Sequence, residues 1–306
     1  MVSDVAYIGR FAPSPTGPLH FGSLVAAVAS YADARAADGQ WLLRIEDVDA
    51  PRCTQAAEMA ISRQLSVYGF VADGAVIRQS GRGDHYEVVL EALKSSGRLF
   101  ACNCSRKMLA FARRNALSEV IYPGRCRNLK LMGSAPATAL RLRVQDDANA
   151  QIAFKDRALR VLSQNVAKEV GDFILRRADG LYAYQLAVVV DDAAQGITDV
   201  VRGEDLLMNT PRQIYLQHCL DYSTPRYLHV PLVKNQAGEK LSKQTLATAI
   251  AADTAIPTLK AAWAFLNQPD IGHVASVAQF WQRAIPIWNA ALMRSDRSSA
   301  CPVIHG

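Results

Sequence analysis

Apolar and polar positions in the first hundred residues follow two alternating spacings. Residues 5–11 and 41–46 are short runs rich in apolar and aromatic side chains, which is typical of strands. Around them, apolar residues recur every three or four positions, which predicts helices at 19–35, 56–68 and 86–96. Strand and helix alternating from the start of a chain favour an α/β fold with a parallel sheet.

From residue 100 onward this pattern changes. Residues 100–130 lack a regular apolar spacing, and residues 139–177 alternate short strand-like runs with polar breaks. Near the end, Pro257 is suited to the first position of a helix. The elements expected in this part are strands at 168–175 and 182–190, a strand that ends at 200–205, and helices at 211–220, 257–268 and 277–293.

The change of pattern predicts a domain inserted into an α/β sheet. The expected organisation is a catalytic domain split between residues 1–100 and 196–250, an inserted α+β domain at 101–195, and a helical extension at 251–306 without an anticodon-binding domain.

Composition narrows the class of protein. The chain has 306 residues, 50% of them hydrophobic and 20% charged, which excludes a disordered or fibrous chain. No stretch approaches the ~18–20 continuous apolar residues of a membrane helix. The N-terminus lacks a basic segment followed by an apolar one, so no signal peptide is expected. We therefore expect a cytoplasmic protein that does not bind membranes, and nothing in the sequence calls for more than a monomer.

Positive charge is concentrated in one segment. The formal net charge is +6, and residues 98–130 hold eight basic side chains against one acid, Glu119. A basic patch of this kind suits phosphate contacts with a polyanion, and a solvated helix face is the alternative. The basic residues are Arg98, Arg106, Lys107, Arg113, Arg114, Arg125, Arg127 and Lys130.

Cysteines cluster in the same segment. Three of the six cysteines, Cys102, Cys104 and Cys126, fall within 25 residues. In a chain without a secretion signal, such clustering indicates metal rather than a disulfide framework. Structural zinc usually has four ligands, and no histidine lies in this segment. Three thiols without a metal are the alternative.

A turn and a loop carry the candidate nucleotide chemistry. Residues 12–18 contain three prolines and a glycine, so this segment is a turn that leads from the first strand into a helix. Backbone N–H groups and the helix dipole at such a place favour anions. His20 can donate to a phosphate, and Gly22 lets a nucleotide approach closely. Farther along, Lys240 and Lys243 form a candidate cation clamp. Taken singly, each is better explained by a structural role, His20 as a turn histidine and the two lysines as part of a solvated loop.

Together, these two elements resemble the HIGH-type and KMSKS-type signatures of class I aminoacyl-tRNA synthetases. Four strings are similar to the glutamyl and glutaminyl branch: GRFAPSPTGPLHFG at 9–22, RIEDVD at 44–49, YQLAVVVDD at 184–192 and VRGEDL at 201–206. The resemblance spans about residues 7–245. Ser23 stands where the first signature ends in histidine, and Leu241 and Gln244 depart from the second.

The resemblance implies a Rossmann-like parallel sheet with an inserted zinc-containing α+β domain and a short helical C-terminus. It implies L-glutamate and ATP with Mg²⁺ as substrates. The roles that it assigns are catalysis by His20 and Lys243, ATP binding by His20, Gly22, Lys240 and Lys243, and glutamate binding by Arg10, Phe11, Ala12, Pro13, Ser14, Glu46, Tyr184 and Arg202.

Two further features resemble the truncated, stand-alone paralogues of glutamyl-tRNA synthetase, the glutamyl-Q tRNA(Asp) synthetase family. That family has a Cys-x-Cys…Tyr-x₃-Cys pattern, which implies one structural zinc held by Cys102, Cys104, Tyr122 and Cys126. Only 62 residues follow Gln244, which leaves no room for the long helical anticodon-binding region of the full enzyme. The family transfers glutamate to queuosine at the wobble position of the tRNA(Asp) anticodon, and it activates glutamate without tRNA, whereas the full enzyme needs tRNA.

Three other functions stay open on the sequence alone. A truncated glutamyl-tRNA synthetase that charges a tRNA 3′ end would share every motif. A small-molecule nucleotidyltransferase or ligase of the HxGH type is a second alternative, and the string from Arg10 to Gly17 and the motif from Arg202 to Glu204 argue against it. A catalytically dead zinc-containing RNA-binding protein would keep the fold and fail to bind ATP.

Overall fold

The computed structural model describes residues 6–115, 118–129, 138–233 and 249–294. Its centre is a five-stranded sheet in the order β10-β9-β1-β2-β3, and each pair of neighbouring strands in it runs parallel. The predicted α/β fold with a parallel sheet is therefore confirmed. The strands are β1 (Ile8–Phe11), β2 (Gln40–Ile45), β3 (Ile77–Arg78), β9 (Asp199–Gly203) and β10 (Arg226–Val230).

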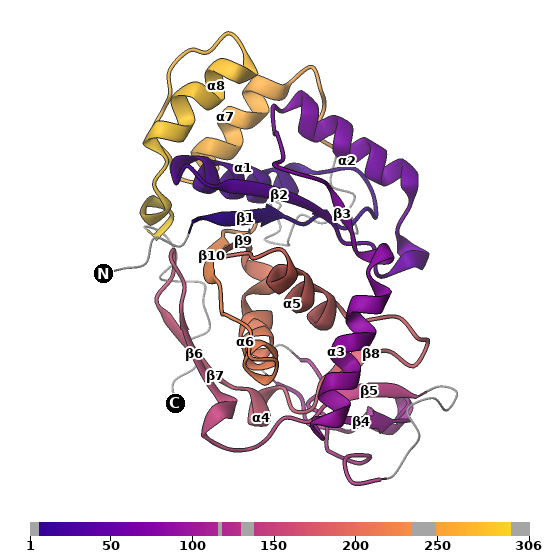
Figure 1. The fold of residues 1–306 in the computed structure, drawn as a ribbon. Coiled ribbons are helices and arrows are strands. Elements are labelled where there is room, and N and C mark those ends of the chain that lie inside the picture. The colour runs from indigo at the N-terminus through magenta and orange to yellow at the C-terminus, as the bar shows by residue number, and fades with distance from the viewer. Residues whose placement is uncertain (1–5, 116–117, 130–137, 234–248, 295–306) are drawn as a thin grey trace.

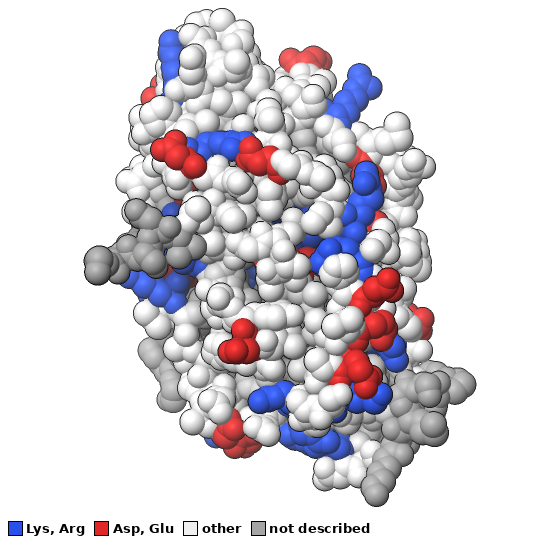
Figure 2. Space-filling model, in the orientation of Figure 1, with Lys and Arg blue, Asp and Glu red and all other residues white. Residues whose placement is uncertain are grey.

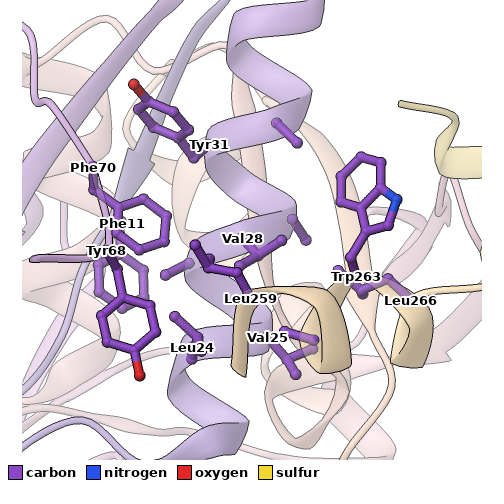
Figure 3. Packing of buried hydrophobic residues seen from close by; sticks show 14 of the residues in the cluster. Phe11, Leu24, Val25, Val28, Tyr31, Tyr68, Phe70, Leu259, Trp263 and Leu266 are labelled. Atoms are coloured by element: carbon purple, nitrogen blue, oxygen red, sulfur yellow. The ribbon is translucent and has the colours of Figure 1, made fainter. Parts of the chain in front are cut away.

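Helices cover both faces of this sheet (Figure 1). On one face, α1 packs against α7 and α8. Its buried Leu24 and Val28 lie among Leu259 and Trp263 of α7 and the aromatic rings of Phe11, Tyr68 and Phe70 (Figure 3). On the other face lie α5 and α6, which join α3 in a second core. The helices are α1 (Phe21–Ala36), α2 (Gln55–Val67), α3 (Gly83–Ser95), α5 (Tyr184–Ala194), α6 (Thr210–Cys219), α7 (Ala255–Phe265) and α8 (Val277–Ala284).

The predicted strand at 182–190 is wrong, because this segment forms helix α5. All residues from Leu186 to Asp192 are buried. A helix that is covered on all sides shows a continuous apolar run instead of a stripe, and such a run has the same appearance as a buried strand. As a consequence, Tyr184 is the first residue of helix α5 and not part of a strand.

The part of the chain between α3 and α5 forms two smaller sheets. Strands β4 (Leu99–Cys102), β5 (Ala139–Leu142) and β8 (Ile174–Arg176) pair antiparallel, and β6 (Gln151–Lys155) forms a hairpin with β7 (Val161–Asn165). The predicted strand at 168–175 is wrong in its first part, because α4 (Val166–Glu169) is a short helix capped by Asn165. The boundaries of an inserted domain at 101–195 stay a prediction.

Basic side chains gather at the end of the molecule that holds β4 and β5, as Figure 2 shows on one face. Of the basic residues in segment 98–130, five are exposed and two are half-buried, while Lys130 lies outside the described residues. The five exposed residues are Arg106, Lys107, Arg113, Arg114 and Arg125.

Two C-terminal predictions need correction. Helix α7 begins at Ala255, so Pro257 is its third residue rather than its first; a proline is tolerated there because the first N–H groups of a helix have no partner within it. Helix α8 ends at Ala284 instead of continuing to 293, because Pro286 has no backbone N–H to continue the helical hydrogen bonds. In the described part of the chain, none of the helices has the length and apolar character to cross a membrane.

Candidate active site

A cavity of about 490 Å³ opens where the parallel strands β1, β9 and β10 end, against the first turn of α1. Open α/β sheets bind ligands at the carboxyl ends of their strands. The cavity is lined by every described residue that the motifs single out for glutamate and ATP: Arg10, Phe11, Ala12, Pro13, Ser14, His20, Gly22, Glu46, Tyr184 and Arg202. Lys240 and Lys243 lie outside the described residues.

A larger cavity of about 780 Å³ lies beside the C-terminal half of α5. Its wall is made mostly of apolar side chains such as Val88, Val189 and Ile197, and it contains none of the residues that the resemblance assigns to glutamate or ATP binding. We therefore take the smaller cavity as the candidate active site, because charged side chains converge there.

The first turn of α1 forms one wall of that smaller cavity. His20 is the N-cap residue of α1, and its Nδ1 accepts from the backbone N–H of Ser23 at 3.3 Å. The Ser23 hydroxyl lies 3.1 Å from His20 Nε2. Ser23, which departs from the family signature, thus contacts the signature histidine directly. The first turn contains no acidic side chain, so the positive end of the helix dipole faces the cavity without a competing carboxylate.

A buried network of charges forms the floor between β1, β2 and α5. The Asp192 carboxylate accepts from Arg10 Nε at 3.0 Å and lies 2.7 Å from Arg44 Nη1. Arg44 also donates to Glu46 at 3.2 Å. Burial alone would raise the pKa of Asp192, but the guanidinium groups of Arg10 and Arg44 outweigh it and lower that pKa below its usual value. Asp192 is therefore held ionised, and it fixes the plane of Arg10.

Glu46 and Tyr184 also face the cavity, and their pKa values are raised, whereas that of Asp192 is lowered. Burial raises the pKa of the Glu46 carboxyl, and Arg44 and Arg10 offset this rise only in part. Burial also raises the pKa of Tyr184, with the nearby Glu46 as the next cause. A buried carboxylate that has lost its hydration binds a cation from the ligand more strongly than an exposed one does.

Arg202 enters the cavity from β9 and is 5% exposed. Its Nε donates to His229 Nε2 at 3.1 Å, Nη1 to the Gln213 side chain at 2.8 Å, and Nη2 to the Thr210 hydroxyl at 2.7 Å. These hydrogen-bond partners of the guanidinium are all neutral groups. Within the described ranges, no ion pair joins Arg202 to a carboxylate, whereas Arg10 has Asp192.

The sequence motifs locate the cavity but miss the residues behind it. Asp192 has a weak signal, since it follows a long apolar run and is a charged residue inside a motif. Asp156 and His229 have none, because 73 residues separate them and neither stands in a motif.

Three thiols and a phenol meet in a separate cluster between β4 and the segment around residue 122. The Sγ atoms of Cys102, Cys104 and Cys126 all lie within 4.8 Å of one another, with 3.5 Å between those of Cys104 and Cys126. The Tyr122 hydroxyl lies 3.4 Å from Cys102 Sγ and 3.8 Å from Cys104 Sγ. Arg141 stacks over the Tyr122 ring at 4.0 Å.

These donors fit a tetrahedral zinc ion. Zn–S bonds of ~2.3 Å and a Zn–O bond of ~2.0 Å set S···S and S···O edges of roughly 3.8 and 3.5 Å, close to the distances observed. Burial would raise the pKa of Cys102, but hydrogen bonds with Tyr122 and Arg141 lower it to about 7. A lowered thiol pKa favours the thiolate that binds metal. The pKa of Cys104 shifts the other way, to about 11, because it is partly buried beside the other thiols, so the geometry and not the pKa supports the site.

Comparisons with known proteins agree with this geometry. Residues 8–256 match the family model for tRNA synthetases class I (E and Q), catalytic domain. A protein of Thiobacillus denitrificans is 55% identical over 277 residues, and one of Burkholderia mallei is 53% identical over 288 residues. The matches cover 90% and 93% of this chain and 91% and 96% of those proteins, and both proteins are named Glutamyl-Q tRNA(Asp) synthetase.

Among solved structures, the glutamate-tRNA synthetase of Elizabethkingia anophelis is similar with a TM-score of 0.76. The sequence identity is 23%, and the match covers 94% of this chain and 66% of that one, so this likeness concerns the fold.

Proposed function

The chain belongs to the class I tRNA synthetases of the E and Q type, in the glutamyl-Q tRNA(Asp) synthetase family, and we propose that it activates L-glutamate with ATP and transfers it to queuosine in the anticodon of tRNA(Asp). The single observation that supports glutamate best is the cavity at the strand ends, in which a buried acid and two buried arginines converge on one space. These substrates meet in the cytoplasm, and we place the reaction there.

Glutamate has one ammonium group and two carboxylates, and the cavity offers a partner for the ends that must be held. Glu46 takes the ammonium, since it is buried and its charge is only partly offset, whereas Asp205, the other carboxylate in the described lining, is exposed. The α-carboxylate has to stay mobile enough to attack ATP. Arg202, which has neutral partners, therefore takes the side-chain carboxylate, together with Arg10. Tyr184 closes the wall.

ATP binds at the first turn of α1. His20 and Gly22 lie against its phosphates and ribose, and Lys240 and Lys243 act on the phosphates as the loop signature implies. ATP carries Mg²⁺ in this family. In the first step an α-carboxylate oxygen of glutamate attacks the α-phosphorus. A P–O bond forms, the bond to the bridging oxygen breaks, and pyrophosphate leaves with that electron pair, giving glutamyl-adenylate.

In the second step a hydroxyl of the queuosine cyclopentene ring attacks the carbonyl of the adenylate. A C–O ester bond forms and AMP leaves with the phosphate oxygen, while the hydroxyl proton passes to solvent or to that phosphate. The described residues contain no obvious dedicated base for this proton. An acyl adenylate is reactive, so positioning of the hydroxyl is the main requirement.

We propose that Cys102, Cys104, Tyr122 and Cys126 hold one structural zinc ion. With four protein ligands the ion has no open position for catalysis. It would fasten the segment around Tyr122 to the end of β4, where a regular apolar core is absent and only a small cluster of buried residues forms.

The first experiment is glutamate-dependent ATP–pyrophosphate exchange in the absence of RNA, with glutamine and aspartate as controls. Exchange with glutamate alone supports the proposal. Exchange only after addition of tRNA indicates the enzyme that charges the 3′ end. No exchange under either condition, together with no ATP binding, indicates a catalytically dead RNA-binding protein.

A second experiment separates the two acceptors. Labelled glutamate is offered to tRNA(Asp) that carries queuosine and to an unmodified transcript of the same tRNA. The proposal expects label on the modified tRNA only. Label on the transcript, which has a 3′ end but no queuosine, contradicts it.

A further inference from the structure

We infer that Asp156 and His229 are positioning residues that fix Arg202 for the side-chain carboxylate of the amino acid. The inference rests on the proposed function, since it concerns how the cavity recognises glutamate. Neither residue lines the cavity, and each is completely buried. Their hydrogen bonds link them to the cavity through Arg202.

The contact that carries this inference joins neighbouring strands. His229 on β10 stands in register with Arg202 on β9, so both side chains leave the sheet on one face. Arg202 Nε donates to His229 Nε2 at 3.1 Å, and His229 Nδ1 lies 2.7 Å from Asp156 Oδ2. The three side chains form a continuous chain from a buried carboxylate to the guanidinium in the cavity.

The hydrogen-bond donors among Arg202, His229 and Asp156 determine which nitrogen of the imidazole carries the proton. The guanidinium N–H can only donate, so His229 Nε2 must accept, and the ring proton sits on Nδ1, which donates to Asp156. The Thr210 hydroxyl accepts from Arg202 Nη2 at 2.7 Å and lies 3.2 Å from the same Nε2. One neutral tautomer therefore satisfies all of these contacts.

Asp156 is itself immobilised. One carboxylate oxygen accepts from the backbone N–H groups of Ala158 and Leu159, both at 2.9 Å. The other accepts from the His229 backbone N–H at 3.0 Å and from its ring. The segment after β6 thus anchors the histidine, and through it the arginine of another strand.

This arrangement serves a purpose that a direct ion pair would not. A carboxylate in contact with Arg202 would occupy the donors that the substrate needs and would repel its negative charge. Asp156 is instead separated from Arg202 by the imidazole ring of His229, so its negative charge lies near the guanidinium without contacting it. Arg202 is oriented and its positive charge remains available to the cavity, in contrast to Arg10, which Asp192 contacts directly.

The test compares Asp156→Asn, His229→Leu and His229→Gln with His218→Gln, a control in an exposed histidine on α6. Each purified full-length variant is assayed by ATP–pyrophosphate exchange for the KM of glutamate, the KM of ATP and kcat, and its melting temperature is measured. L-Glutamine, which lacks the side-chain charge, is the second substrate probe.

We expect Asp156→Asn and His229→Leu to raise the KM for glutamate about tenfold or more, as loss of a hydrogen bond to a charged group does. The KM for ATP should change less than about twofold, and the preference for glutamate over glutamine should fall. His229→Gln keeps an acceptor for Arg202 and should recover part of the loss. His218→Gln should behave as wild type.

Three outcomes overturn the inference. Folded Asp156→Asn and His229→Gln proteins with an unchanged KM for glutamate leave no positioning role, and this conclusion holds even where His229→Leu fails to fold. Equal increases in both KM values indicate a general structural role. If wild type shows no glutamate-dependent exchange, the proposed function fails and this inference fails with it, whereas the first two outcomes leave the proposed function intact.

Discussion

Replacing Asp192 by asparagine removes one negative charge from the floor of the cavity while nearly conserving side-chain volume. Asp192 contacts two guanidinium groups, those of Arg10 and Arg44, which are 3% and 0% exposed. After the change, Glu46 and Asp191 are the neighbouring acids left for Arg44, and burial already raises the pKa of Glu46. Removing one partner from a buried ion pair costs about 3–5 kcal/mol, because the charge that stays behind is uncompensated. We expect Asp192→Asn to lower the free energy of unfolding by about that amount.

The assay is denaturant and thermal unfolding of the two proteins, with Asp179→Asn as the control. Asp179 pairs with Arg177 at the surface, where solvent screens the pair and it contributes little to stability. At about 2.1 cal/mol/K of unfolding entropy per residue, one kcal/mol shifts the melting temperature of a 306-residue chain by roughly 1.6 °C, so Asp192→Asn should lower it by roughly 5–8 °C. If Asp192→Asn lowers the free energy of unfolding by less than about 1 kcal/mol at neutral pH, the reasoning that Asp192 compensates the charges of Arg10 and Arg44 is refuted.

The pH dependence of the same experiment has a defined sign. The pKa of Asp192 is lower in the folded protein than in the unfolded chain, where it is about 3.9. Its stabilisation is therefore complete above the unfolded value and is lost as pH falls through the folded value. The stability difference between wild type and Asp192→Asn should stay constant between about pH 6 and 8 and narrow only below about pH 4. A difference that narrows near neutral pH points to another group.

Three more measurements test the cavity, the thiol cluster and the basic surface. Because burial raises the pKa of Glu46 above its ordinary value of 4.5, and only the carboxylate binds ammonium, kcat/KM for glutamate should fall on acidification with a midpoint above 4.5; a midpoint at or below 4.5 contradicts the assigned role. Wild type purified without chelators should contain about one equivalent of zinc by elemental analysis, and Cys104→Ser should contain less than about half an equivalent, since structural zinc needs its fourth ligand; equal metal contents would exclude the cluster as the site. Phe111 is fully exposed beside the basic residues Arg113 and Arg114, so Phe111→Ala should weaken tRNA binding by about 5- to 150-fold, as loss of base stacking does, and leave RNA-free exchange unchanged. The exposed apolar control Met59→Ala should leave tRNA affinity unaltered, and a Phe111→Ala protein that binds tRNA like wild type would remove Phe111 from the interface.

Local pattern predicted most of the sheet and its flanking helices, and it failed at α5 for a physical reason. In an amphipathic helix such as α3, the face toward water carries polar residues, so the apolar residues of the other face recur every three or four positions in the sequence. Helix α5 lies between the sheet, α3 and α6, and its central residues are all buried. The sequence of Leu186 to Val190 therefore contains no polar position that could reveal a period of 3.6 residues.

The candidate site divides along a similar line. The residues that we propose as ligand contacts stand within motifs, and the described ones all line the same cavity. Residues that hold those groups in place come from distant parts of the chain. Asp156 meets His229 only because the segment after β6 returns to the edge of β10, where Asp156 bridges to Tyr227. That meeting depends on tertiary structure, which no spacing along the chain encodes.

The two buried arginines of the cavity, Arg10 and Arg202, show why the supporting residues matter for specificity. Both are buried, and both need a counter-charge, because a buried guanidinium without one is costly. Arg10 has its carboxylate in contact and is thereby a fixed wall with part of its charge already neutralised. Arg202 has neutral acceptors around it and the Asp156 carboxylate behind His229. A substrate carboxylate therefore gains more from Arg202 than from Arg10, and an amide, which brings no charge, gains little from either. Discrimination between glutamate and glutamine then depends on the environment of one side chain rather than on the number of arginines in the cavity.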